Sequence, residues 1–462
     1  MTDRPARLAP YIETHRDRIL ATLVDWLQIP SMSALPAHAD DVRRSAVRAA
    51  ELLADAGLEH VEVLETAGLP SVYGDWLHAG PRAPTVVVYG HHDVQPVDPL
   101  ELWDSPPFTP EIRDGQCFAR GAIDDKGQVL YEIEAVRGLL QTDGALPVNI
   151  KFLIEGEEEV GSVHFESLLE RERDRLTCDV VVVSDTGMVA TDVPSTTVGM
   201  RGLVAFSVHI RSAEGDLHSG MFGGAVPNAA LVASRLAAAI HDSHGRVTVD
   251  GFYDEVRELS EQEAASLASV PFDDREWMAQ AGVTALTGEE GRSVLEQVGT
   301  RPTAEVVGIA SGYAGAGIKT IVPATATLKI AFRLVPDQDP EGIARSFAEW
   351  VAARTPAGVT IDIESEGAVR PALTPIDHPA VGALSRVIER VWGRAPLFTR
   401  EGGSGPEEAL GRVLDAPVLF LGVGLPDDRI HAPNERMVMD QFWKGLLAAG
   451  ELWAEIAHAC GT

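Results

Sequence analysis

Apolar residues recur at two spacings along the chain, and these spacings predict its helices and strands. Helical spacing predicts a helix over residues 10–27, which ends before Pro30, and a second over residues 40–58, which contains its terminating glycine, Gly57. Apolar runs predict strands at residues 61–64, 71–76, 85–89, 148–154 and 179–183. A further helix is predicted from about residue 126 to residue 140. Because helices and strands alternate, we expect an α/β fold with a mostly parallel, twisted sheet and helices on both faces.

The pattern changes character near residue 196. Residues 202–211 and 326–334 alternate apolar and polar positions, which is typical of a sheet with one exposed face. Helical patterns follow at residues 227–241 and 340–354. These elements predict a small α+β domain, residues 198–368, inserted into a discontinuous first domain formed by residues 1–197 and 369–462. The last segment has a predicted helix at 378–391, a strand at 417–421 and a terminal helix at 439–457.

The composition indicates a large core and an acidic surface. Hydrophobic residues make up 45% of the 462 residues, and 69 Asp and Glu against 38 Lys and Arg give a formal net charge of −31. Such a charge repels nucleic acid and anionic membranes, so we expect neither as a partner. Most of these carboxylates are expected to be solvated surface groups, and only a few belong to a site.

The three cysteines, Cys117, Cys178 and Cys460, are far apart and odd in number. They predict no disulfide framework and no cysteine metal site, and we expect buried thiols in a reducing compartment. The first ten residues contain no apolar run of the signal-peptide type, and no apolar stretch approaches the length of a membrane span. A cytoplasmic protein is therefore expected.

Metal-capable side chains follow three of the predicted buried strands. The strand at 85–89 is followed by Gly90 and then by His91, His92 and Asp93. The strand at 148–154 runs into five positions that contain Glu155, Glu157, Glu158 and Glu159, and the strand at 179–183 is followed by Asp185. Open α/β sheets place their chemistry at the carboxyl ends of their strands. The sequence therefore predicts a site at this edge.

Each candidate residue has a simpler structural alternative. His91 and Asp93 can point the same way in an extended segment, so that one binds a metal and the other orients it, but they can equally form a structural pair. Asp124 precedes a predicted helix and can act as its N-cap. Asp185 can be a turn residue, and His431 can be an ordinary exposed loop imidazole.

The acidic run admits two interpretations as well. It can be a solvated acidic face. Alternatively, Glu159 binds a metal while its neighbour Glu158 faces a water molecule and acts as a general base. Taken together, the candidates supply two histidines and three carboxylates, with Glu158 left for proton transfer. Nitrogen and oxygen donors without thiolates favour zinc, manganese or cobalt.

Four motifs occur in an order that resembles a known family. They are Gly90-His91-x-Asp93, Asp124-Asp125-Lys126-Gly127, Glu158-Glu159 and the late His431. The chain resembles the co-catalytic di-zinc exopeptidases, which include carnosinase-like cytosolic dipeptidases, aminoacylase, glutamate carboxypeptidase and succinyl-diaminopimelate desuccinylase. Five stretches look like the dipeptidase branch: 91–96, 216–220, 319–323, 332–336 and 400–404.

The resemblance implies a set of roles around two zinc ions per subunit, with manganese or cobalt as possible substitutes. It implies a bridging Asp124, one site completed by His91 and Asp185, and the other by Glu159 and His431. It implies that Glu158 is the general base and later the acid, that Asp93 tunes His91, and that the peptide between Asp124 and Asp125 is cis.

The resemblance also implies a ferredoxin-like inserted domain that acts as a lid and dimerises. In the expected homodimer His218 reaches the site of the partner subunit and stabilises the oxyanion, with Thr320 nearby. Arg333, Gly403 and Ser404 would hold the C-terminal carboxylate of the substrate. The alternatives are a loop imidazole for His218 and a surface ion pair for Arg333.

Three positions depart from the family pattern. His92 stands where relatives often have Tyr or Leu, so the choice of His91 as ligand depends on its spacing to Asp93. Ala316 occupies a position that is often acidic, and Ile123 replaces a frequent Ser or Thr. The last two changes could shift substrate preference.

The expected function is metal-dependent hydrolysis of the peptide bond of dipeptides, by a metal-activated water and Glu158. One alternative keeps the chemistry but acts on N-acyl amino acids, as aminoacylases and desuccinylases do, or on longer peptides as a carboxypeptidase. Another is a non-catalytic metal-bound ligand-binding protein. The presence of Glu158 argues against that alternative, because binding alone needs no base.

Overall fold

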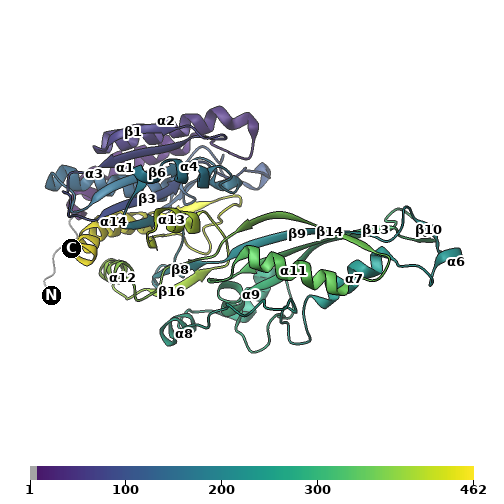
Figure 1. The fold of residues 1–462 in the computed structure, drawn as a ribbon. Helices are drawn as coiled ribbons and strands as arrows, with labels where there is room; N and C mark the ends of the chain where they lie inside the picture. Colours follow the sequence, from purple (N-terminus) through teal and green to yellow (C-terminus); the bar gives the residue numbers. More distant parts are fainter. Residues whose placement is uncertain (1–7, 462) are drawn as a thin grey trace.

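The computed structural model describes residues 8–461 of the chain. It has two parts that lie next to one another (Figure 1). We call residues 8–200 and 370–461 the α/β part, and residues 201–369 the inserted part. The chain crosses between them twice, where strand β8 (Ser195–Met200) continues into β9 (Gly202–Arg211) and where β14 (Thr360–Val369) continues into β15 (Ala372–Leu373).

The α/β part is built on a six-stranded sheet with the order β1-β2-β6-β3-β7-β17. Its strands are β1 (Glu59–Leu64), β2 (Ser71–Trp76), β3 (Thr85–His91), β6 (Asn149–Glu155), β7 (Val180–Val183) and β17 (Val418–Phe420). Strands β6, β3, β7 and β17 are parallel, whereas β1 pairs antiparallel with β2 and β2 antiparallel with β6. The sheet is thus mixed. The connection from β1 to β2, residues 65–70, is too short for the crossover that a parallel pair needs.

Helices cover both faces of this sheet because alternate side chains of each strand point to opposite faces. Val86 and Val88 of β3 belong to one hydrophobic core and Val87 and Tyr89 to another. The first core is completed by α1 (Ala9–Leu27), α2 (Ala39–Ala56), α3 (Lys126–Asp143), α12 (Pro379–Trp392) and α14 (Met439–Cys460). The second is completed by α4 (Phe165–Arg171), α5 (Arg173–Leu176) and α13 (Glu407–Leu414). Each fully buried aliphatic side chain stabilises the fold by about 1.5–3 kcal/mol.

The inserted part has its own antiparallel sheet, in the order β11-β13-β9-β14, and its own hydrophobic core. Its other elements include α7 (Ala229–Ala239), α8 (Glu261–Ala268), α9 (Asp274–Ala281), α10 (Val294–Gly299), β11 (Thr303–Ser311), β13 (Thr325–Leu334) and α11 (Pro340–Arg354). Residues of α7 and α11 pack on one face of the sheet, where Phe206, Phe332 and Phe347 form aromatic contacts. The order β9-α7-β11-β13-α11-β14 is that of a ferredoxin-like unit.

Three small sheets complete the fold. Strands β15, β8 and β16 (Leu397–Glu401) form one beside the crossing points, and β4 (Glu111–Arg113), β5 (Gln116–Phe118) and β18 (Arg436–Val438) form another. The third pairs β10 (Leu217–His218) with β12 (Ile321–Val322). It lies with α6 (Ser219–Phe222) at the end of the inserted part that is farthest from the six-stranded sheet (Figure 1).

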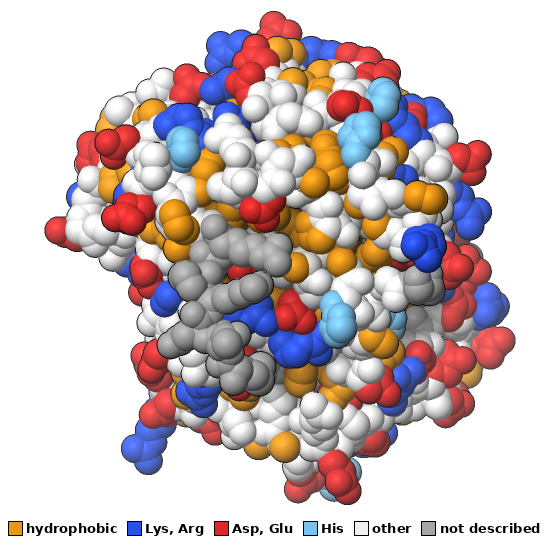
Figure 2. Space-filling view, turned by 90° about the vertical axis from the view of Figure 1, so that its left-hand side faces the viewer, with side chains coloured by type: hydrophobic (Ala, Val, Ile, Leu, Met, Phe, Trp, Pro, Cys, Tyr) orange, Lys and Arg blue, Asp and Glu red, His pale blue; other side chains and the backbone are white. Residues whose placement is uncertain are grey.

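The structure bears on three sequence-based predictions, which concern surface charge, membrane spans and the burial of the cysteines. On the face seen in Figure 2, acidic and basic side chains are interspersed. Among the described residues, no helix combines the length and apolarity needed to cross a membrane. All three cysteines are free thiols, but only Cys117 is buried, whereas Cys178 and Cys460 are half-buried because they lie at the borders of the core.

Candidate active site

The predicted polar residues meet at one edge of the six-stranded sheet. His91 is the last residue of β3 and lies in register with Glu155, the last residue of β6. The one-turn 3₁₀ helix Glu158–Val160 follows β6, and Asp185 follows β7 after one further residue. Because β3, β6 and β7 are parallel, their carboxyl ends deliver these side chains to the same edge.

Asp124 lies at the centre of this cluster, with a different histidine at each of its carboxylate oxygens. Its Oδ1 is 3.0 Å from His91 Nε2, and its Oδ2 is 2.9 Å from His431 Nε2. The peptide between Asp124 and Asp125 is cis, as the resemblance predicted. Two segments that are far apart in the chain therefore converge on one buried carboxylate.

The other two predicted carboxylates lie one on each side of Asp124. Asp185 Oδ2 is 3.5 Å from His91 Nε2, and Glu159 Oε2 is 3.1 Å from His431 Nε2. The structure thus brings together all five side chains for which the sequence predicted metal binding. They form two groups that share Asp124.

Asp93 and Gln95 fix the geometry of this cluster. The carboxylate of Asp93 accepts hydrogen bonds from the backbone N–H groups of Glu158 (3.3 Å) and Glu159 (3.1 Å). Its Oδ1 is 3.4 Å from His91 Nδ1, which lies 3.0 Å from the Asp93 carbonyl oxygen. Gln95 donates from its backbone N–H and from Nε2 to the two carboxylate oxygens of Glu159, at 3.1 and 2.8 Å. The candidate base and a candidate ligand therefore depend on the same short segment.

The mutual contacts change the pKa values of the cluster. Hydrogen bonds to Asp124 and Glu159 raise the pKa of His431 to about 10. Burial lowers the pKa of His91, but Asp185, Asp124 and Asp93 outweigh it and raise the value well above the usual one. Burial raises the pKa of Asp124, but hydrogen bonds from His431 and His91 outweigh it and hold the value well below the usual one. Each imidazole thus lies beside two carboxylates that favour its charged form, and the same surroundings favour a divalent cation.

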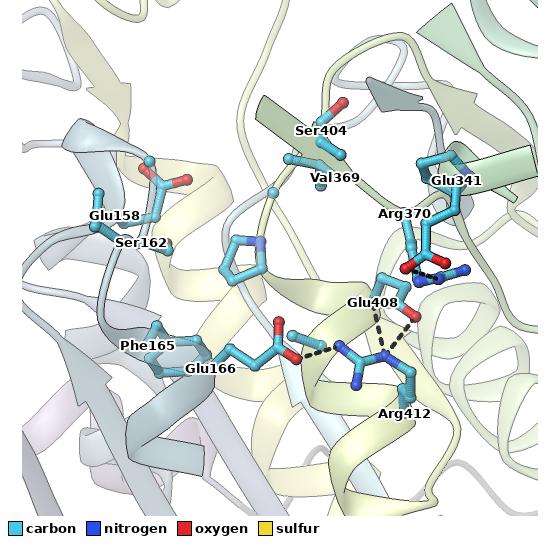
Figure 3. Close-up of a pocket in the computed structure, with 17 residues that line it drawn as sticks. Glu158, Ser162, Phe165, Glu166, Glu341, Val369, Arg370, Ser404, Glu408 and Arg412 are labelled. Carbon is cyan, nitrogen blue, oxygen red and sulfur yellow. Dashed lines mark hydrogen bonds and ion pairs between the residues drawn. The ribbon is translucent and has the colours of Figure 1, made fainter. Parts of the chain in front are cut away.

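Glu158 points into a cavity of about 720 Å³ that lies between the α/β part and the inserted part (Figure 3). Ser404 lines the same cavity. Burial raises the pKa of Glu158, and the carboxylates of Asp185, Glu159 and Asp124 add to this shift. Its position beside the cluster and open to a cavity is the one a general base requires.

The residues predicted to hold the substrate carboxylate are also near one another. Arg333, in β13, donates a hydrogen bond from Nη1 to Ser404 Oγ at 3.0 Å, and Ser404 Oγ donates to the carbonyl oxygen of Arg201 at 2.6 Å. Gly403 borders open space, because a Cβ built there would meet nothing within 4 Å. Arg333 makes no ion pair in the described part of the chain, so the surface ion pair considered above is absent there.

His218 and Thr320 lie far from the cluster in this chain. They belong to the β10–β12 region at the opposite end of the inserted part (Figure 1). The two residues are neighbours, since the N–H of Ser219 donates to the carbonyl oxygen of Thr320 at 3.0 Å. The Nδ1 of His218 accepts a hydrogen bond from the N–H of Gly220 at 3.0 Å. In the neutral imidazole the proton is therefore on Nε2, which is free to donate.

The three departures from the family pattern have different surroundings. His92 is fully buried and its Nε2 lies 2.9 Å from the carbonyl oxygen of Pro70, so it faces away from Asp124. Burial lowers the pKa of His92 to about 4. Ile123 is fully buried, whereas Ala316 is exposed in the loop before β12.

Sequence reasoning missed Glu435, which holds the two loops that carry Asp124 and His431. The buried carboxylate of Glu435 accepts hydrogen bonds from the backbone N–H groups of Gly121 (3.1 Å), Ile123 (3.1 Å) and Asp124 (3.2 Å). It also accepts one from Arg120 Nη1 at 2.6 Å. His431, four residues earlier, has a backbone φ of 61°, a conformation that non-glycine residues seldom adopt and that surrounding contacts must hold.

Replacing Glu435 by glutamine is expected to weaken metal binding by about 10- to 100-fold. The amide directs an N–H₂ group at backbone donors that need an acceptor, so the Asp124 loop shifts. Ion affinity is measured by competition with a chromophoric chelator, and the control is Asp427→Asn, an exposed carboxylate of the same loop that pairs with Arg436. Wild-type ion affinity in Glu435→Gln would refute the positioning role, even if the variant unfolded at a lower temperature.

Comparison with known proteins places this site in a family. The model for peptidase family M20/M25/M40 matches residues 87–455. The Beta-Ala-His dipeptidase of Homo sapiens is 31% identical over 469 residues, which cover 97% of this chain and 92% of that protein.

Two solved structures extend the match to three dimensions. The metallo-carboxypeptidase Sso-CP2 of the M20 family from Sulfolobus solfataricus has a TM-score of 0.83 at 31% identity, covering 95% of this chain and 99% of that one. The dipeptidase Dug1p of Saccharomyces cerevisiae has a TM-score of 0.77 at 26% identity, covering 98% of both chains.

The fold and the cluster of histidines and carboxylates, taken with these matches, define a metallopeptidase. The chain belongs to peptidase family M20/M25/M40. The resemblance stated from the four motifs is thereby confirmed.

Proposed function

We propose that this protein is a metallodipeptidase that hydrolyses the peptide bond of dipeptides with two divalent ions and Glu158. The observation that carries the proposal is the position of Asp124. One of its oxygens faces His91 and the other faces His431, at 3.0 and 2.9 Å. A carboxylate in that position can bridge two ions, each held by its own histidine.

The spacing of the donor atoms fits metal ions. With metal–ligand bonds of about 2.0–2.1 Å, neighbouring donors around a tetrahedral ion lie about 3.3 Å apart. The four histidine–carboxylate distances in the cluster are 2.9, 3.0, 3.1 and 3.5 Å. The donors are nitrogen and oxygen, which suit zinc and leave manganese or cobalt as possible alternatives.

In this proposal His91, Asp185 and Asp124 would hold one ion, and His431, Glu159 and Asp124 would hold the other. Asp125 also lies near His91 and Asp185. Its Oδ2, however, accepts a hydrogen bond from the backbone N–H of His91 at 3.1 Å. We therefore give Asp125 the role of holding the His91 backbone and not that of a ligand.

The chemistry then follows from the neighbours of Glu158. Bound divalent ions would lower the pKa of a water molecule and polarise the scissile carbonyl group. Glu158 takes the proton of that water and later gives it to the leaving amine. Asp93 keeps Glu158 beside the cluster by accepting its backbone N–H, and orients His91.

Two observations support dipeptides as the substrates: the names of the relatives, and a site that can bind the terminal carboxylate of a peptide. Both the human relative and Dug1p bear dipeptidase names. Arg333 and Ser404, with the open backbone at Gly403, offer a cation and hydrogen-bond donors for the terminal carboxylate. A carboxypeptidase that accepts longer peptides is the second candidate, and the name of Sso-CP2 favours it. N-acyl amino acids, which have the same terminal carboxylate, are the third.

We further propose that an inserted domain with the predicted boundaries, residues 198–368, is a lid through which two chains form a homodimer. Strand β11 lies at the edge of its sheet and exposes Val306, Val307 and Ile309. Helix α6, next to His218, exposes Met221 (75%) and Phe222 (40%). Exposed apolar residues on an open sheet edge favour association with another copy. Such a dimer would explain why His218 and Thr320 lie far from the site of their own chain.

The proposed function is tested by comparing Ala-Ala, N-acetyl-alanine and Ala-Ala-Ala as substrates, each with and without a chelator. We expect rapid hydrolysis of Ala-Ala, its loss with chelator and its recovery when zinc or manganese is returned. Exclusive hydrolysis of N-acetyl-alanine would favour the amidohydrolase, and preference for the tripeptide would favour the carboxypeptidase. Undiminished hydrolysis after complete metal removal would contradict the proposal.

A further inference from the structure

A second cavity, of about 320 Å³, lies beyond the carboxylate site and is lined by both Arg201 and Arg333. We propose that this cavity binds an acidic side chain, so that the enzyme prefers dipeptides whose second residue is aspartate or glutamate. The inference rests on the proposed function, because it assumes that Arg333 and Ser404 hold the terminal carboxylate. It adds Arg201 as a residue that determines specificity.

Arg201 is half-buried and has no carboxylate partner in the described part of the chain. Its Nε donates to the carbonyl oxygen of Gly402 at 3.2 Å, and its Nη1 donates to that of Gln297 at 3.3 Å. These contacts fix the plane of the guanidinium but leave its Nη2 without a hydrogen-bond partner among the described residues. Burial, reinforced by repulsion from Arg333, lowers the pKa of Arg201 to about 10, so its charge is held at a cost that a bound anion would relieve.

The other charged residues of the cavity wall leave the cavity with a net positive charge. Arg301 also lines it, but two hydrogen bonds to the carboxylate of Glu289, at 2.7 and 2.8 Å, neutralise it. Glu305 lines the cavity as well, and its side chain is exposed. Arg201 and Arg333 are therefore opposed within the cavity by one exposed carboxylate.

Two hydrogen bonds of Ser404 link the wall of this cavity to the wall of the cavity into which Glu158 points. Ser404 lines the cavity into which Glu158 points, and it contacts Arg333 through its side chain and Arg201 through its backbone carbonyl. A terminal carboxylate on Arg333 and Ser404 would therefore contact one residue of the Glu158 cavity and one residue of the Arg201 cavity. The side chain of the same residue is attached one carbon away and can enter the Arg201 cavity.

A carboxylate suits this cavity better than an amide of the same shape. Guanidinium groups bind carboxylates through charge-assisted, often bidentate hydrogen bonds. An amide would place donors against donors and would leave the charge of Arg201 uncompensated. Hydrogen bonds that involve charged groups are stronger than neutral ones. We therefore expect kcat/KM to be about 10- to 100-fold higher for a dipeptide with the acidic side chain than for one with the amide of the same shape.

The experiment compares Ala-Glu with Ala-Gln, which differ only in that charge, on the zinc-loaded full-length protein. The wild type is expected to favour Ala-Glu about 10- to 100-fold. The ratio of the two kcat/KM values is expected to fall close to one in Arg201→Met, and to stay intermediate in Arg201→Lys, which keeps the charge without the planar fork. Both kcat/KM values are measured on the same preparation, so partial misfolding lowers both by the same factor and does not change their ratio. Arg257→Met, which removes an exposed arginine paired with Asp337, is the matched control and keeps the wild-type ratio.

Glu305→Gln provides an opposite test, since removing the one opposing carboxylate should raise the preference for Ala-Glu. Equal hydrolysis of Ala-Glu and Ala-Gln by the wild type would overturn this inference and leave the dipeptidase proposal standing. An Arg201→Met protein that keeps the wild-type ratio would also overturn it. Hydrolysis of neither dipeptide by the metal-loaded protein would refute the proposed function itself, and this inference with it.

Discussion

Replacing Glu158 by glutamine is expected to lower kcat by about 10²- to 10⁴-fold while both ions stay bound. The amide has the size of the carboxylate but cannot take a proton. No histidine–carboxylate contact of the cluster involves the Glu158 side chain, so the ion-binding residues keep their positions. The measurement is kcat on Ala-Ala together with the metal content of the same sample.

The control comes from the same acidic run. Glu157 is hydrogen-bonded to His164 and Thr66, away from Asp124, and Glu157→Gln is expected to keep its activity. Glu159→Gln is expected to lose metal, because its carboxylate is a proposed ligand. A fully loaded Glu158→Gln enzyme with near-normal turnover would exclude Glu158 as the base.

The second large effect concerns His218, and it tests whether two subunits share each site. His218→Ala is expected to lower kcat by about 10²- to 10³-fold, as the loss of an oxyanion donor does. A heterodimer of His218→Ala with Glu158→Gln should nevertheless be active. In it the His218→Ala subunit supplies Glu158 and receives the imidazole of the other subunit, so one of the two sites is complete.

This experiment uses the two variants co-expressed with different tags, so that the heterodimer is purified by both. We expect about half of the wild-type rate per dimer, because one site of each pair is intact. Each homodimer of a single variant serves as a control and should remain impaired. If His218 acted within its own chain, or not at all, the heterodimer would gain no activity over the homodimers.

The strands that carry the site could be predicted because each is an apolar run that ends in polar residues. Strand β3 begins at Thr85 and β9 spans Gly202–Arg211, as their patterns indicated. The convergence of His91, Glu159 and Asp185 follows from parallel strands meeting at one edge, whereas Asp124 and His431 arrive on loops. The antiparallel pairing of β2 with β6 could not be predicted, because a strand pattern states which residues are buried but not which strand is the neighbour.

Strand β11 and the helices α8 and α9 were missed for a different reason. A register shift between Val306 and Gly308 breaks the alternation of β11, and Val306, Val307 and Ile309 are exposed. Helices α8 and α9 have no buried residue and hence no apolar stripe. Glu435 was missed because its partners include three backbone N–H groups, which no side-chain pattern marks.

The proposed metal ligands and Glu158 all lie in one part of the chain, whereas Ser404 of that part and Arg333 of the other share the proposed carboxylate site. Every candidate ligand and Glu158 belong to residues 8–200 and 370–461, whereas Arg201, His218, Thr320 and Arg333 belong to residues 201–369. Laboratory evolution confined to residues 201–369, with His218 and Thr320 kept, could therefore redirect which peptides are cut while leaving the candidate ligands and Glu158 unchanged. The same separation would let related enzymes acquire different substrate specificities by exchanging one continuous segment of the gene.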